Sequence, residues 1–296
     1  MRIPPALAVL AAHRGGCGRG LGRPDAPAMH PGLRAAALLL LAVCLTLGLT
    51  GCAAQGSAAQ PSVLAAGTVE PTDAQRLATI RLELAAAFLE NNQPAVALEE
   101  ANRAVQADPN LAAAHNLRGL VLLQLNEPVL AEQSLQQALR LAPRDGDSWH
   151  NLAWLQCQQG RFGEAMQSFA RALQAPNYPA LPRSWMAQGI CQARAGQSAE
   201  AVQSLTRSFE LDSGNPITLY NLALLLHQRQ DSERARFYLR RLNHSEFANA
   251  ESLWLGIKIE NRLQNREAAQ QLGHQLQRRF PDSRQANAYE RGAFDE

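Results

Sequence analysis

Small residues recur with a period of about 34 residues along most of this chain, and this period limits the possible folds more than any other feature. Two series of glycine and alanine show the period, twelve residues apart: Ala85, Gly119 and Ala153, and Ala97, Ala131 and Ala165. Apolar residues at helical spacing surround both series, and Gly160 lies where one helix ends and the chain must reverse. Each unit is therefore predicted to be a hairpin of two amphipathic helices, which buries its apolar face only against a neighbouring unit.

The series continues beyond the third unit with small changes of spacing. An insertion of two residues leads to Gly189, and a further step of one full period leads to Ala223. One more step, which we expect to be one residue shorter, leads to Gly256 and Ala268. Helical hairpins with this pattern and a length of about 34 residues are typical of the tetratricopeptide repeat (TPR). We therefore predict an all-α protein, a right-handed α-solenoid of about six TPR helix pairs.

The expected domain boundaries follow from the repeat. The solenoid is expected over residues 73–281, with units near 78–111, 112–145, 146–179, 182–215, 216–248 and 249–281. Residues 282–296 form a polar tail that either adds a short capping helix or frays, and the sequence leaves both alternatives open.

The N-terminal part carries the pattern of an exported protein. We expect residues 1–28 to be a non-native or disordered leader and Met29 to be the true start. Residues 29–51 resemble a lipoprotein signal peptide, because an apolar run over 35–49 follows a short basic start and is too short for an ordinary transmembrane helix.

The apolar run ends in Leu-Thr-Gly-Cys at residues 49–52, which resembles a bacterial lipobox. Cys52 is therefore the predicted lipidation site, and residues 52–72 are expected to be the lipidated cysteine and a flexible tether. An ordinary secretory cleavage site and a chance cysteine are the alternatives. Because Ala53 and not an aspartate follows the cysteine, the resemblance implies an outer-membrane location on the periplasmic face.

Charge and motif content exclude several classes of function. Residues 1–51 hold five arginines and one aspartate, so the remaining 23 basic and 25 acidic residues give about −2, and no basic stripe indicates a nucleic-acid partner. We find no phosphate-binding GxxxxGK[ST], no zinc-binding HExxH and no GxSxG nucleophile motif. We expect no enzyme activity, no metal, no cofactor other than a covalent lipid on Cys52 and no small-molecule substrate.

The first helix of each pair is expected to line a concave groove, by resemblance to the TPR family. The predicted protein-binding groove residues are Leu82, Leu89, Asn116, Leu120, Leu123, His150, Trp154, Met186, Tyr220 and His227. In the sixth unit the corresponding positions hold Leu253, Ile257 and Glu260. Most of these residues are apolar, which disfavours a clamp for a C-terminal carboxylate and favours an amphipathic helix or a hydrophobic strand of a partner. For Ala86, Ile190 and Leu224, packing between repeats is an equal alternative.

Two cysteines lie in the first helices of adjacent units. A bridge between Cys157 and Cys191 would require Cα atoms within about 7 Å in an oxidising compartment. Their positions in the unit, twelve and ten, place them on different sides of the helix. We therefore expect two unbridged, buried small residues, with a disulfide as the alternative.

Two segments add a more specific resemblance. The connection and helix APNYPALPRSWMAQGICQARAG over 175–196 and the segment ESLWLGIKIENRLQNREAAQQLGHQLQRRFPDS over 251–283 resemble the type IV pilus biogenesis lipoprotein family PilF/PilW, often called pilotins. Together with the lipobox and six TPR units, the resemblance covers residues 49–283. It implies an outer-membrane lipoprotein that binds the pilus secretin subunit and promotes its outer-membrane localisation and multimerisation. The 28-residue leader departs from the family pattern.

One alternative within the same architecture is another periplasmic TPR lipoprotein, an adaptor for a protease or for cell-envelope assembly. It shares the lipid anchor and the groove, and only the two segments just quoted argue against it. An enzyme would need a catalytic constellation in the irregular connection 175–182 or in the tail 282–296, and neither segment contains one.

Overall fold

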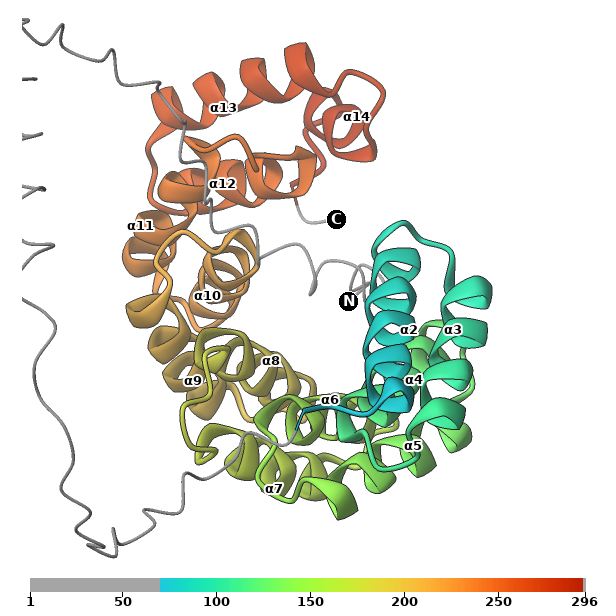
Figure 1. Cartoon of the computed structure of the whole chain (residues 1–296). Coiled ribbons are helices and arrows are strands. Elements are labelled where there is room, and N and C mark those ends of the chain that lie inside the picture. The colour runs from blue at the N-terminus through green and yellow to red at the C-terminus, as the bar shows by residue number, and fades with distance from the viewer. Residues whose placement is uncertain (1–69, 295–296) are drawn as a thin grey trace, which may run out of the picture. The chain divides into compact units, whose positions relative to one another are not determined.

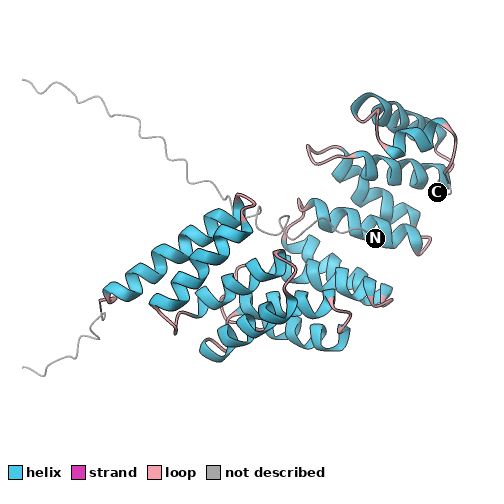
Figure 2. Cartoon of the chain, turned by 90° about the vertical axis from the view of Figure 1, so that its right-hand side faces the viewer, coloured by secondary structure: helices cyan, strands magenta, loops and turns pink. Residues whose placement is uncertain are grey.

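The computed structural model describes residues 70–294, and these residues form helices and no strand (Figures 1 and 2). The first six helices are α2 (Asp73–Glu90), α3 (Pro94–Ala107), α4 (Ala112–Gln124), α5 (Pro128–Leu141), α6 (Gly146–Gln158) and α7 (Phe162–Leu173). The others are α8 (Leu181–Arg194), α9 (Ser198–Leu211), α10 (Pro216–Gln228), α11 (Ser232–Asn243), α12 (Ala250–Arg262), α13 (Arg266–Arg279) and α14 (Arg284–Glu290). The predicted all-α solenoid of TPR helix pairs is confirmed.

The helices pack as six antiparallel pairs, from α2 with α3 to α12 with α13. The first helices of neighbouring pairs contact one another in chain order, from α2 with α4 to α10 with α12. Each second helix also packs on the first helix of the next pair, so first and second helices form two layers (Figure 1). Buried alanines and leucines fill the space between the layers, and Ala85, Ala131, Ala153 and Ala201 have no exposed surface.

The turn inside each pair has the same backbone conformation in all six units. The second residue after the end of each first helix has a positive φ of 57–80°, and these residues are Asn92, Asn126, Gly160, Gly196, Gln230 and Gln264. The next residue donates its backbone N–H to a carbonyl five residues earlier, as in Arg161 N to Gln156 O at 2.9 Å. This is the Schellman arrangement that ends a helix and satisfies its last carbonyls.

These turns correct the expected register of the sixth unit. Gln230 and Gln264 are one full period apart, as are the N-cap residues Asn215 and Asn249, so the last step is not shortened. The small residue at the interface between the two helices of the pair is therefore Ala269, which is 4% exposed, and not Ala268. Gly256 suggested the shorter step because it was taken as the small residue of the first helix.

The C-terminal tail forms a capping helix, which resolves the alternative left open by the sequence. Ser283 caps α14 by accepting the N–H of Ala286, and α14 packs on α12 and α13. Tyr289 occupies the space beside Gly273, where a Cβ would meet its ring at 2.0 Å. The last helix pair is thus covered by α14, as terminal repeats of a solenoid require.

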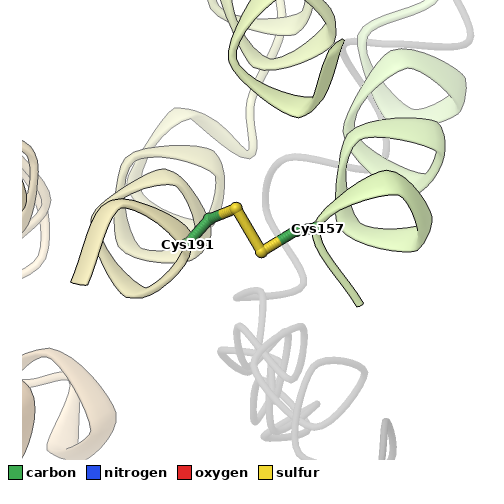
Figure 3. Close-up of a disulfide and its surroundings, with 2 residues drawn as sticks. All are labelled: Cys157 and Cys191. Carbon is green, nitrogen blue, oxygen red and sulfur yellow. A yellow bond between two sulfur atoms is a disulfide. The ribbon is translucent and has the colours of Figure 1, made fainter. Parts of the chain in front are cut away.

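A disulfide joins Cys157 of α6 to Cys191 of α8, with the two Cα atoms 5.8 Å apart (Figure 3). The prediction of two unbridged cysteines was therefore wrong. The two residues do lie on different sides of their helices, but neighbouring first helices pack side by side. Cys157 lies on the side of α6 that faces α8, and Cys191 lies on the side of α8 that faces α6. A disulfide between neighbouring first helices therefore requires cysteines on opposite sides of the two helices.

We expect this disulfide to contribute about 3–4 kcal/mol to the free energy of unfolding, because it closes a 34-residue loop in the unfolded chain. The measurement is urea unfolding of the full chain with and without reductant, compared with a Cys157→Ser, Cys191→Ser double variant. Reductant should lower the unfolding midpoint of the wild type to that of the variant and leave the variant unchanged. Equal midpoints for oxidised wild type and variant would contradict this contribution.

Candidate protein-binding surfaces

Seven of the ten predicted groove residues are partly exposed in the first-helix layer. They are Leu82, Asn116, Leu120, Leu123, Trp154, Tyr220 and His227. We call the surface that these residues form the first-helix face. Its first three units are mainly apolar, apart from Asn116, which accepts a hydrogen bond from Asn151 Nδ2 at 2.9 Å. The face can contact an apolar segment of a partner, as the sequence predicted for a groove.

The other three predicted groove residues are buried, and their assignment to the groove was wrong. Leu89 is 2% exposed and packs with Ala85, Ala97 and Leu117 in the core of the first two units. Met186 is 5% exposed and packs in the core cluster that contains Leu222. Because neighbouring first helices lie side by side, these side chains fill the interface between them and do not reach the surface.

His150 is the third buried residue and belongs to a polar network between α6 and α8. It is 3% exposed, and its Nδ1 is 2.8 Å from Ser184 Oγ. Ser184 Oγ is also 3.0 Å from the hydroxyl of Tyr178, which comes from the inserted connection. The ring of Phe169 packs edge-on at a centroid distance of 5.9 Å. Burial, and secondly the charge of Arg183, hold the pKa of His150 well below its ordinary value.

The lowered pKa of His150 predicts a loss of stability on acidification. The folded state keeps the imidazole neutral, whereas the unfolded chain takes up a proton below about pH 6.5. The free energy of unfolding should therefore fall as the pH drops below this value, by up to about 1.4 kcal/mol per pH unit for this residue. Urea unfolding of the full chain across this range measures the slope. A His150→Gln variant should have a shallower slope than the wild type, and equal slopes for the two proteins would contradict the assignment.

The corrected register changes the surface of the sixth unit. Leu253 and Ile257, which were expected in the groove, have no exposed surface, and Glu260 is 2% exposed. Glu260 accepts hydrogen bonds from Arg240 Nε at 3.1 Å and Nη2 at 3.0 Å, on the side of the second helices.

Trp254, Lys258 and Asn261 lie one full period after Tyr220, Leu224 and His227, at the groove positions of the sixth unit. Trp254 is buried at this position, in the core cluster of the last helix pair. Lys258 is partly exposed and Asn261 is exposed. Lys258 is the only lysine of the chain. The sequence analysis missed it because the register was shifted by one residue, and the spacing of Asn215 and Asn249 could have revealed the shift.

A second surface, which the sequence analysis missed, lies on α2 at the open end of the solenoid. Ile80 is 54% exposed, whereas the equivalent residues of the later units are small and have no exposed surface: Ala114, Ser148, Ser184, Thr218 and Ser252. In each later unit the preceding pair covers this position. Among the described residues no helix precedes α2, so Ile80 is uncovered. A large apolar side chain where later units have small ones was the signal in the sequence.

Two leucines extend this apolar surface along α2. Leu77 is 45% exposed and Leu84 is 39% exposed, and with Ile80 they lie on one side of the helix at spacings of three and four residues. We call these three residues the α2 end face. Exposed apolar patches on soluble domains mark interaction sites, and here the patch has the geometry of a missing helix–helix contact.

The described part of the chain shows no arrangement for metal chemistry. Within residues 70–294 no group of three or more His, Cys, Asp and Glu side chains is placed to hold a metal ion. None of the helices in this range combines the length and the apolar character that crossing a bilayer requires. The leader 1–28, the signal peptide 29–51 and the lipidation site Cys52 lie outside the described residues, so these expectations stay predictions.

The fold and its repeated turns define a TPR protein. Family models described as tetratricopeptide repeat match residues 82–146 and 134–167. The type IV pilus assembly protein PilF of Pseudomonas aeruginosa is 29% identical over 251 residues, which covers 85% of this chain and 95% of PilF. The chain is homologous to PilF.

Two solved structures extend this similarity to three dimensions. The structure of Pseudomonas aeruginosa PilF matches with a TM-score of 0.67 and 25% identity, over 75% of this chain and all of PilF. The crystal structure of PilW, described as a widely conserved type IV pilus biogenesis factor, matches with a TM-score of 0.66 and 28% identity, over 72% of this chain and 98% of PilW. These relatives are pilus assembly and biogenesis factors, which is consistent with the expectation that the chain is not an enzyme.

Proposed function

We propose that this chain is an outer-membrane lipoprotein of type IV pilus biogenesis that binds the secretin subunit and promotes its outer-membrane localisation and multimerisation. Homology to PilF over 95% of that protein is the observation that carries the pilus assignment. The lipobox at residues 49–52 supports the membrane anchor, and the two exposed apolar surfaces support a protein partner.

The α2 end face is the surface that we assign to the secretin subunit. A solenoid unit buries its apolar face only against a neighbour, and α14 supplies this neighbour at the other end. An amphipathic helix or a strand of the partner that packs on Leu77, Ile80 and Leu84 would take the place of a preceding unit. Burial of these three side chains would supply a driving force of about 25 cal/mol per Å² of apolar surface.

The anchor and the binding surface act together in this proposal. Acyl chains on Cys52 would keep the solenoid at the membrane, since each buried CH₂ group contributes about 0.8 kcal/mol. The tether over 52–72 would confine a captured subunit to the same surface. The effective concentration of secretin subunits at the membrane then rises without any additional contact, which favours their assembly into a multimer.

Substitutions on α2 test this assignment. We expect an Ile80→Glu, Leu84→Glu double variant to lose secretin capture by at least about tenfold, because the apolar contact would bury two charges. The measurement is affinity capture from membranes with the full chain, with bound proteins identified by mass spectrometry. Leu89→Glu is unsuitable for this purpose, because Leu89 is buried and the charge would destabilise the fold.

Val129→Glu is the matched control, because Val129 is 66% exposed on α5 in the layer of second helices. This control should capture secretin as the wild type does. Equal capture by the double variant and the wild type would show that the α2 end face does not bind secretin. Capture of a protease or of a cell-wall enzyme instead of secretin would contradict the proposed function and favour the adaptor alternative.

A further inference from the structure

One second helix carries a large aromatic side chain at a surface position where every other second helix has a polar residue. Phe237 is the sixth residue of α11, and its side chain is 58% exposed. The sixth residues of the other second helices are exposed and polar: Glu99, Gln133, Gln167, Gln203 and Gln271. The packing of the repeat therefore does not need an aromatic residue here. An exposed phenylalanine at a position that is otherwise polar indicates a contact with another molecule.

Phe237 belongs to a groove between α9 and α11, which both pack on α10. The rings of Phe209 and Phe237 meet edge-on at a centroid distance of 6.3 Å, and Leu211 is 44% exposed at the end of α9. Toward the start of α11 the groove widens into a hollow of about 640 Å³, which Val202 and Leu226 help to line. We call this hollow, together with Phe209, Leu211 and Phe237, the α9–α11 groove.

Arginines outnumber carboxylates in and beside the α9–α11 groove. Three arginines and two acidic residues line the hollow: Arg207, Arg229, Arg234, Glu210 and Asp231. A fourth arginine, Arg241, lies beside the aromatic residues, with its guanidinium carbon 5.9 Å from the centroid of the Phe209 ring. Four arginines and two carboxylates leave two positive charges uncompensated, and this excess favours an anionic partner.

All four arginines are accessible to a partner. Arg229 and Arg241 are exposed and form no ion pair within residues 70–294. Arg207 and Arg234 are each 55% exposed, and each pairs with a carboxylate three residues away in the sequence. Exposed pairs of this kind are weak, so these arginines can also contact a carboxylate of a partner.

We propose that the α9–α11 groove binds an acidic peptide segment that carries one aromatic or large aliphatic side chain. The apolar side chain packs on Phe237 and Leu211, and carboxylates on both sides of it pair with Arg229 and Arg241. The groove lies in the layer of second helices, so its partner segment differs from the one that we assign to the α2 end face. The inference therefore does not rest on the proposed function.

The positions of the arginines on α11 set the spacing of the carboxylates in the partner. Arg234 precedes Phe237 by three residues and Arg241 follows it by four, which corresponds to about 4.5 Å and about 6 Å along the helix axis. An extended peptide advances about 3.3 Å per residue. Carboxylates two or three residues before and after the apolar residue would therefore reach these arginines.

Three peptides test the groove directly. The probes are fluorescein-labelled GSDEGFGEDSG, GSNQGFGQNSG and GSDEGAGEDSG, all with amidated C-termini, so the second lacks the carboxylates and the third lacks the aromatic ring. Fluorescence anisotropy with the full chain in detergent measures their binding. We expect the first peptide to bind about tenfold more tightly than either of the others. We also expect added salt to weaken its binding, because salt screens the charges.

Substitutions at Phe237 and Arg229 test the apolar and the ionic contact separately. Phe237→Gln, which introduces the residue of four other units, should lower the affinity for GSDEGFGEDSG by about fivefold or more, and Phe237→Trp should retain it. Arg229→Gln should lower this affinity by about threefold or more and leave the binding of GSNQGFGQNSG unchanged, because one charge is removed. Arg229→Lys keeps the charge and should retain the preference for the acidic peptide.

Matched controls lie at exposed sites elsewhere in the layer of second helices. Val129→Gln on α5 replaces an exposed apolar residue, Arg278→Gln on α13 replaces an exposed cation, and both should bind the peptides as the wild type does. Equal affinity of the wild type for all three peptides would overturn the proposal. Losses in Phe237→Gln and Arg229→Gln no larger than those in the two controls would also overturn it, because the binding would then not involve the groove.

Discussion

Side-by-side packing of the first helices is the interaction on which the rest of the structure depends. A pair of helices this short cannot bury its own apolar face, so each pair is stabilised by the next. The packing explains why Leu89, His150 and Met186 are buried, and it brings Cys157 within bonding distance of Cys191. It also leaves the first and the last helix pair with a neighbouring pair on one side only.

The two ends of the solenoid differ in whether the apolar side of the terminal helix pair is covered. At the C-terminal end α14 covers the last pair, and the ring of Phe294 stacks on Trp254 at a centroid distance of 5.6 Å. At the other end Ile80 presents a large apolar side chain where every later unit buries a small one. A partner that packs on α2 would make the same kind of apolar contact with the first pair that each preceding pair makes with the next.

The period of small residues was sufficient to predict the class of fold and the number of units, because it encodes local packing that repeats. It was less informative where neighbouring units meet. Gly256 resembled the expected small residue but lies one position away from it, so Leu253, Ile257 and Glu260 were assigned to the groove although they are buried. A leucine such as Leu89 fits an exposed groove and a buried interface between repeats equally well. Only the packing of the neighbouring helices shows which of these two places it takes. Ile80 was overlooked because the groove positions of the family were considered alone.

The central claim is that secretin packs directly on the exposed end of α2. Site-specific photo-crosslinking in cells that assemble pili is the most direct test, with benzoylphenylalanine in place of Ile80 or, as the control, of Val129 on α5. The account predicts a crosslink between residue 80 and a secretin subunit, identified by mass spectrometry, and none from residue 129. Crosslinks to secretin from residue 129 and not from residue 80 would contradict it, because the partner would then bind the second-helix layer.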